Sequence, residues 1–282
     1  MSKARFAKQS IVVLCLGACA LAGSAHPQEQ VSAHPQMNET PSQAEQEQTL
    51  LGMRNYAEDY TAKLPNFICE QVTSQFEAGR KPNHWKKGDT LTSKLVFNRG
   101  REQRTLELVN NKPAHFNGRP WRTPLTTEGE FGILLANIFD PVTEAKFSWD
   151  GWDTVRGHRV AKFNYSVDRE HSTLSLSLSD LAKAIVPYHG SVYGDPESGA
   201  VWHITSETAS IPEQVQTKSI ATTIDYDQVT IGSQAYLLPV EANVLMVTDA
   251  THVRNEMRFQ GYRKFEAEST IKFGGEDENP PK

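Results

Sequence analysis

Apolar and polar residues alternate over most of the chain after Pro65. A period of two indicates strands with one face on a core and the other in water, as is typical of antiparallel sheets. The clearest apolar rows are Ala161, Phe163, Tyr165, Val167; Leu174, Leu176, Leu178; and Tyr236, Leu238, Val240, Ala242, Val244, Met246. The pattern therefore predicts a large antiparallel sheet.

A further row runs from Met257 to Phe273, and Gly261 within it predicts a bulge or bend. Turn sequences separate neighbouring runs and predict hairpins. They are Arg99-Gly100, Arg156-Gly157, Asp195-Pro196-Glu197-Ser198-Gly199 and Gly232-Ser233. Because no regular alternation of strands and helices is present, a parallel, doubly wound sheet is not expected.

Two segments have the three- and four-residue spacing of amphipathic helices. The first has the apolar face Leu50, Met53, Ala57, Tyr60 and Leu64, and Pro65 ends it. In the second, Thr127 and Glu130 predict a capping box before an apolar stripe that Asp140-Pro141 ends. Neither helix is stable alone in water, so both are expected to pack on the sheet. The predicted fold class is α+β, mainly β.

The first 25 residues have the three parts of a secretory signal peptide. Lys3, Arg5 and Lys8 form a basic start, the apolar run 11–22 follows, and small residues lead to Ala25. The apolar run is about a dozen residues long, which is too short to cross a bilayer. We therefore expect an exported protein, periplasmic or extracellular, that is cleaved after Ala25.

Cys19 offers an alternative, because Leu16-Gly17-Ala18-Cys19 resembles the site at which bacterial lipoproteins are lipidated and cleaved. The apolar run before Cys19 would then be only about six residues, and small residues continue to Ala25, so cleavage after Ala25 is favoured. The choice is between a free form and a form that is lipid-anchored through Cys19.

The rest of the chain is expected to hold one folded domain. Residues 26–48 are polar and predicted to be a disordered linker, 49–273 a single β-rich domain, and 274–282 a disordered acidic tail. No stretch after residue 25 is apolar for about 20 residues, so no transmembrane segment is expected in the mature chain. The residues indicate no oligomeric state.

Charge and cysteine content narrow the class of protein. Removal of residues 1–25 takes away three positive charges, so the formal net charge falls from −5 to −8. An acidic protein does not attract phosphate backbones, so nucleic-acid binding is not expected and Arg99, Arg101 and Arg104 are predicted to be solvated. Cys69 is the one cysteine left; its apolar context predicts a buried, unreactive thiol rather than a disulfide or a nucleophile.

No catalytic or metal-binding motif stands out. The serine-hydrolase and zinc-protease signatures are absent, and the histidines, His189, His203 and His252 among them, have no spacing typical of ligands. The acidic pairs Asp225/Asp227 and Glu266/Glu268 project from one strand face, whereas a glycosidase needs carboxylates facing each other. Trp149 and Trp152 flank Gly151, and core packing is favoured over a ligand surface. We expect no cofactor, no metal and no catalytic residue.

Four fragments resemble a family of uncharacterised exported bacterial proteins. They are Leu64-Pro65-Asn66-Phe67-Ile68-Cys69, Gly129-Glu130-Phe131-Gly132, Ile138-Phe139-Asp140-Pro141 and Gly261-Tyr262-Arg263-Lys264-Phe265. The order of signal, linker, helix and many strands with an inserted helix is also similar to the bacterial lipoprotein-carrier architecture. That resemblance implies a large curved antiparallel sheet, an incomplete barrel, packed against two or more helices around an apolar cavity. It transfers no catalytic residue, because fold does not determine function.

Three functions stay open at this point. The first is a non-catalytic envelope protein that holds an apolar ligand, a lipid or acyl chain, on inner-face residues such as Phe163, Tyr165, Leu238, Val240 and Phe259. The second is an interaction or scaffold protein of the envelope with a protein partner, docking through an exposed strand or apolar patch. The third is a hydrolase in which His189, His203 or His252 meets a nucleophile in a cleft.

Overall fold

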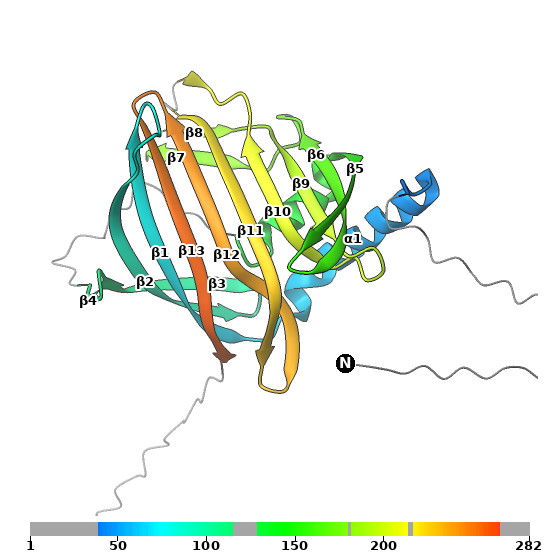
Figure 1. Ribbon diagram of the computed structural model, residues 1–282, viewed down its shortest axis with the longest axis horizontal. Coiled ribbons are helices and arrows are strands. Elements are labelled where there is room, and N and C mark those ends of the chain that lie inside the picture. Colours follow the sequence, from blue (N-terminus) through cyan, green and yellow to red (C-terminus); the bar gives the residue numbers. More distant parts are fainter. Residues whose placement is uncertain (1–38, 115–128, 180–181, 214–216, 266–282) are drawn as a thin grey trace, which may run out of the picture. The chain divides into compact units, whose positions relative to one another are not determined.

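A computed structural model describes residues 39–114, 129–179, 182–213 and 217–265. From Thr40 onward the described residues belong to one compact unit that contains a large sheet, two α-helices, a short 3-10 helix and a small hairpin (Figure 1). The predicted signal peptide with Cys19 and Ala25, the start of the linker and the acidic tail lie outside the described residues. None of the described helices has both the length and the apolar character needed to cross a membrane.

Helix α1 (Gln43–Lys63) opens the folded unit. Ser42 and Glu45 form a capping box, in which each side chain bonds the backbone N–H of the other residue. The helix therefore begins at Gln43, and the prediction that the disordered linker extends to residue 48 is wrong for its last residues. The apolar face predicted from the sequence is confirmed, since Met53, Ala57 and Tyr60 are buried.

Eleven strands form a single sheet in which all neighbours are antiparallel. The strands are β1 (Phe67–Gly79), β2 (Lys86–Asn98), β3 (Arg101–Val109), β4 (Lys112–Pro113), β5 (Lys146–Val155), β6 (His158–Val167), β9 (Tyr188–Gly194), β10 (Val201–Thr208), β11 (Thr217–Ile231), β12 (Gln234–Thr248) and β13 (Thr251–Lys264). Their order is β4-β3-β2-β1-β13-β12-β11-β10-β9-β6-β5. The edges β4 and β5 do not pair with each other, which confirms the predicted incomplete barrel (Figure 1).

The predicted turns are confirmed. Arg99-Gly100 and Arg156-Gly157 each have positive φ at both residues, as a two-residue hairpin turn requires. The turn after Asp195 joins β9 to β10, and Gly232-Ser233 joins β11 to β12. These short connections explain why consecutive strands are neighbours over most of the sheet.

Two glycines create bulges where the sequence places them. At Gly151, φ is 141° and the register between β5 and β6 shifts. The bulge brings Trp149 and Trp152 together at 5.0 Å between ring centroids, and Trp149 packs on Phe163. Core packing of this pair is therefore confirmed. At Gly261, φ is 65° and the register between β1 and β13 shifts opposite Cys69.

Helix α1 and the turn between β9 and β10 meet through glycines. A Cβ atom on Gly199 would lie 2.2 Å from the carbonyl oxygen of Gly52, and one on Gly194 would lie 2.4 Å from Met53. Since Gly199 also has a φ of 72°, the turn favours glycine for both conformation and space. The hydroxyl of Tyr60 donates to the carbonyl of Leu237 at 3.0 Å and fixes the other end of the helix.

Helix α2 (Ile133–Phe139) is followed by the 3-10 helix η1 (Pro141–Thr143). The predicted capping box is wrong for Glu130: the helix starts after Gly132, at a φ of 116°, without a side-chain cap, and Thr127 lies outside the described residues. A Cβ on Gly132 would lie 2.9 Å from the Tyr60 ring, so the two helices meet there. Asp140 ends the helix, as predicted, and caps η1 through the N–H of Val142.

A separate hairpin of β7 (Ser175–Ser179) and β8 (Ala182–Ile185) carries the leucine–serine alternation. The main apolar core lies between the two α-helices and one face of the large sheet. We call this the inner face. Ile204, Ile224, Ala242 and Met257 pair directly across β10 to β13 and mark it.

Candidate functional site

Aromatic side chains fill one end of the inner face of β1, β2 and β13, which we call the ring-filled end. Phe131, fully buried, comes just before α2 and touches the rings of Phe67, Phe97, Phe259 and Tyr262 at centroid distances of 5.2–6.4 Å. Phe67 and Phe97 also stack on each other at 5.0 Å. Such offset and edge-to-face contacts are the favourable arrangements of aromatic rings.

A buried ion pair fixes the segment before α2 to this end. An Arg104 Nη donates to the Glu130 carboxylate at 3.2 Å, and the Glu130 side chain is 2% exposed. The carboxylate of Glu102 lies 3.6 Å from the same Arg104 nitrogen. The prediction that Arg104 is solvated is therefore wrong, because the strand turns this side chain inward. The sequence did not reveal this ion pair, because nothing in it indicates that Arg104 contacts Glu130, 26 residues later.

Tyrosines surround the same region. The hydroxyl of Tyr226 donates to the backbone carbonyl of Glu130 at 3.3 Å. Burial raises the pKa of Tyr60, Tyr226 and Tyr262 above the ordinary tyrosine value, because the phenolate would lose its hydration. These hydroxyls therefore stay protonated and act as hydrogen-bond donors.

The other end of the inner face is different, and we call it the polar end. Counting along β1 from Phe67 and Cys69, the next inward positions are Gln71, Thr73 and Gln75, while Val72 and Phe76 point outward. Opposite them on the neighbouring strands lie Ser93 on β2 and Asn255 on β13. Gln71, Thr73, Ser93 and Asn255 are each at most 8% exposed. At this end Gln71, Thr73 and Gln75 of β1 face the core, whereas in most antiparallel sheets the polar residues of a strand face water.

Two amide groups at the polar end each have a buried atom without a hydrogen bond to any described residue. The Gln71 amide nitrogen donates to the Thr73 hydroxyl at 3.1 Å, but its oxygen has no partner in the described part of the chain, although the residue is 5% exposed. The same holds for the buried nitrogen of Gln75. The buried apolar residues on the neighbouring strands are aliphatic or methionine: Leu91 and Met257 lie opposite Thr73, and Val253 pairs with Glu77 and with Met246.

Of the candidate ligand residues from the sequence, Phe259 lies opposite Gln71, and the others are on β6 and β12. Phe163, Tyr165, Leu238 and Phe259 are at most 4% exposed and belong to the packed core. Val240 is half-buried at a bulge, because Asp225 pairs with Glu241 and Tyr226 with Pro239. The Tyr165 ring faces Gly190 across the strand pair, and its hydroxyl donates to the carbonyl of Thr205 at 2.9 Å. These side chains stabilise the sheet.

Cys69 lies between the two ends of the inner face and is 1% exposed. Burial raises the pKa of its thiol to about 12, with smaller opposing effects from Tyr262 and Arg104. A thiol needs to ionise to attack a substrate or bind a metal. The prediction that Cys69 is buried is confirmed.

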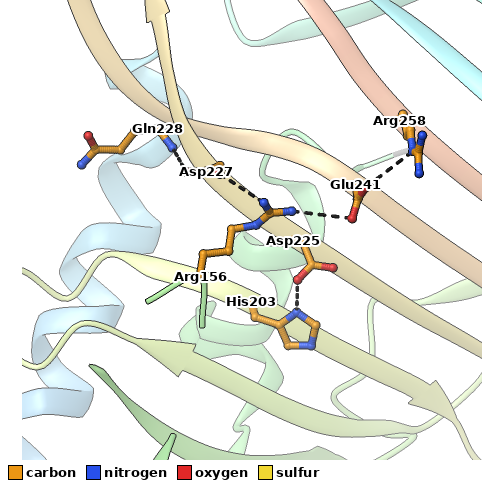
Figure 2. A network of polar contacts seen from close by, with 7 residues as sticks. All are labelled: Arg156, His203, Asp225, Asp227, Gln228, Glu241 and Arg258. Carbon is orange, nitrogen blue, oxygen red and sulfur yellow. Dashed lines mark hydrogen bonds and ion pairs between the residues drawn. The ribbon is translucent and has the colours of Figure 1, made fainter. Parts of the chain in front are cut away.

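The outer face carries charged residues in a ladder across the strands (Figure 2). His203 bonds Asp225 through Nδ1 at 2.8 Å, and Arg156 lies between Asp227 at 3.2 Å and Glu241 at 3.6 Å. The two aspartates therefore have separate partners instead of sharing a site. Most of these side chains are substantially exposed, and exposed ion pairs contribute little to stability.

Two shallow depressions on the outer face hold two of the histidines singled out in the sequence. One, of about 400 Å³, includes His203, Tyr193 and Arg156; the other, of about 520 Å³, includes His189. His252 is on β13 and contacts the carbonyl of Gly79. Among the described residues, Asp225 is the one side chain hydrogen-bonded to His203, and no group of three or more His, Cys, Asp or Glu is placed to hold a metal.

No protein-family model matches the chain, and no curated protein matches it. Solved structures with a similar arrangement include a DUF1329 family protein from Desulfovibrio piger, with 10% identity, a TM-score of 0.40, and coverage of 82% of this chain and 96% of that one. A LolA superfamily protein from Nitrosomonas europaea has 7% identity, a TM-score of 0.31, and coverage of 77% and 94%.

A third structure is an outer membrane lipoprotein-sorting protein domain from Vibrio parahaemolyticus, with 9% identity, a TM-score of 0.38, and coverage of 78% and 94%. All three structures cover at least 77% of this chain. With TM-scores below 0.5, they assign no ligand, partner or activity to this chain.

Proposed function

We propose that this protein is an exported, non-catalytic envelope protein that holds the apolar part of a ligand, such as a lipid or acyl chain, at the polar end of its inner face. One observation carries the proposal: the inner face is filled by rings at one end, whereas the other end combines methionines and aliphatic side chains with buried amide atoms that have no hydrogen-bond partner among the described residues. A core that serves only folding satisfies its polar groups. Methionines adapt to ligands of different shape.

Native mass spectrometry of protein purified from a bacterial envelope tests this function. The proposal predicts a population heavier than the bare chain by the mass of an amphiphile, and loss of that mass after extraction with organic solvent. Incubation with a lipid extract should restore it. A clean ligand-free mass that stays unchanged after incubation would contradict the proposal.

Export depends on the N-terminal 25 residues in this proposal. Cleavage after Ala25 gives a free form that begins at His26, and lipidation of Cys19 is the alternative that anchors the protein. The intact mass of the exported protein decides between the two. A chain beginning at His26 without added mass supports the free form, and a chain beginning at Cys19 with acyl chains supports the anchored form.

The alternative of a docking scaffold has less support. Edge strand β5 has Lys146, Asp150 and Asp153 along it and a bulge at Gly151, and edge strand β4 has two residues and ends in Pro113. Charges, bulges, prolines and shortness are the devices that prevent another strand from pairing with an edge. Exposed large apolar residues of the described chain are scattered over separate elements, namely Leu51, Ile133, Val142 and Ile185.

The hydrolase alternative also has less support. His203 is held by Asp225 and packs against the Tyr193 ring at 4.9 Å, but among the described residues no serine, threonine or cysteine side chain hydrogen-bonds it. A general base needs a proton to accept within hydrogen-bond reach. His189 and His252 have other neighbours, as described above.

A further inference from the structure

Gln71 is the most completely enclosed polar side chain on β1. It is 5% exposed, with Ser93 opposite it on β2 and Phe259 opposite it on β13. Among the described residues its amide makes a single hydrogen bond, from its nitrogen to the Thr73 hydroxyl, and its oxygen has no partner. The two ends of an amide are assigned from hydrogen bonding, yet either orientation leaves one end without a partner.

Gln75 repeats this situation two inward positions further along β1. Its buried amide nitrogen has no partner within the described ranges, and it lies opposite Asn255 of β13, which is 4% exposed. At about 3.4 Å per strand residue, the backbones of Gln71 and Gln75 are about 14 Å apart. The unsatisfied amides therefore follow a line along the strand, with Thr73 between them.

Such an arrangement is unfavourable for a core that contains only protein. A buried amide without a hydrogen bond is destabilising, and leucine or valine at these positions would fill the same space without that cost. The outward positions Val72 and Phe76 show that apolar side chains occur on this strand, on its other face. Violations of the usual pattern in natural proteins are found at functional sites.

We infer that the ligand held on the inner face is not a plain hydrocarbon but carries a group that both donates and accepts hydrogen bonds, the chemistry of an amide or a hydroxyl, and that Gln71 binds this group. The inference rests on the proposed function and names the chemical class of its ligand. The Gln71 amide has a donor and an acceptor end, so a ligand group with both capacities matches either orientation. In the orientation that the structure has, the Gln71 nitrogen bonds Thr73 and the free end is the oxygen, so an ester, which only accepts, leaves that oxygen without a donor.

The test uses the mature chain after removal of bound lipid, with the apolar fluorophore N-phenyl-1-naphthylamine as the reporter. Three amphiphiles of equal chain length compete with it: N-methyldodecanamide, dodecan-1-ol and methyl dodecanoate. Because a buried hydrogen bond left unmade costs about 1.4 kcal/mol or more, the amide or the alcohol should compete about tenfold better than the ester. Comparison of the amide with the alcohol shows which of these two groups Gln71 prefers.

Gln71→Leu is the decisive variant, and Gln103→Leu is the matched control, since Gln103 is an exposed glutamine on β3. We expect Gln71→Leu to bind the fluorophore as tightly as the wild type, to lose the roughly tenfold preference over the ester, and to melt at the same or a higher temperature. The control should keep the preference. Gln71→Met, which is unbranched and of similar length, replaces the leucine variant where that variant fails to fold.

The outcomes separate this inference from the proposed function. Fluorophore binding with no preference among the three amphiphiles would overturn the inference alone. A preference that survives in Gln71→Leu would overturn the role of Gln71. Failure of the wild type to bind the fluorophore or any amphiphile would overturn the proposed function and the inference with it.

Discussion

The two ends of the inner face of β1, β2 and β13 share the same strands but have opposite chemistry. At the ring-filled end, Phe131 contacts four other rings and Glu130 is paired with Arg104. At the polar end, Gln71 and Gln75 are turned inward with amide atoms that no described residue hydrogen-bonds. The comparison teaches that one sheet supports both a self-sufficient core and an interior whose hydrogen bonds are incomplete. The first end stabilises the fold, and the second is where we propose that a ligand binds.

Substitution of Phe131 should have the largest effect. Phe131→Ala removes the ring that joins α2 to three strands, and a buried phenylalanine replaced by alanine costs about 3–5 kcal/mol of unfolding free energy. Urea unfolding followed by circular dichroism measures the loss. Ile133→Ala is the control, because Ile133 is 52% exposed two residues later. Similar losses in both variants would show that the ring-filled end is not the core.

Alkaline pH should destabilise the protein through the buried tyrosines around the ring-filled end. Burial raises the pKa of Tyr60, Tyr226 and Tyr262 in the folded state, whereas in the unfolded chain they titrate near the ordinary tyrosine pKa of about 10. Unfolding above pH 10 therefore releases protons, so the stability contribution is complete below pH 10 and is lost as the pH rises. Each such group costs roughly 1.4 kcal/mol per pH unit above 10.

Urea unfolding at several pH values, together with tyrosinate absorbance of the folded protein, measures this effect. The free energy of unfolding should be flat between pH 7 and 9 and fall from pH 10 upward. Titration of all eight tyrosines near pH 10 in a protein that is still folded would contradict the burial on which the comparison depends.

Loss of the ion pair should have an intermediate effect. Glu130→Gln leaves Arg104 without its buried carboxylate partner, and a hydrogen bond between charged groups contributes about 1.5–3 kcal/mol. Thermal and urea unfolding would report the change. Glu107→Gln, at an exposed position of β3, should leave stability unchanged. Equal stability of the Glu130 variant and its control would mean that this pair does not fix the segment before α2.

The smallest effect on stability is expected at the polar end. Gln71→Leu removes a buried amide with an unmet hydrogen bond, so the ligand-free variant should lie within about 1 kcal/mol of the wild type or be more stable than it. Urea unfolding of lipid-free protein measures the difference. A loss comparable to that of Phe131→Ala would show that Gln71 belongs to an ordinary core.

The sequence predicted the sheet, its turns and the bulge at Gly261, because a period of two and glycine conformations are local properties. It did not show the bulge on β12 at Val240, and it could not foresee the pairing of Arg104 with Glu130. Helix α1 starts earlier than expected because Ser42 and Glu45 cap it, a signal that was present in the sequence. The capping box predicted from Thr127 and Glu130 was a false signal, since α2 begins after Gly132 and the Glu130 carboxylate pairs with Arg104.

The polar end was beyond sequence reasoning for a physical reason. Along β1, the apolar residues change phase, because Phe67 and Cys69 share a face with Gln71 whereas Val72 and Phe76 lie on the other face. The pairing of β1 with β13 shows which face is inward, since it places Gln71 opposite Phe259 and Thr73 opposite Met257. Pairing between strands so far apart in the chain is set by the whole sheet, and one strand's pattern does not reveal it.

Photocrosslinking with a diazirine-bearing fatty amide tests the central claim most directly. The lipid-free mature protein is irradiated with the probe, and modified peptides are located by mass spectrometry. The account predicts adducts on inward positions of the polar end, in the segments 71–75, 89–93 and 253–257, and fewer adducts in Gln71→Leu. Adducts confined to the outer face around His203, or to the Phe131 end, would contradict it.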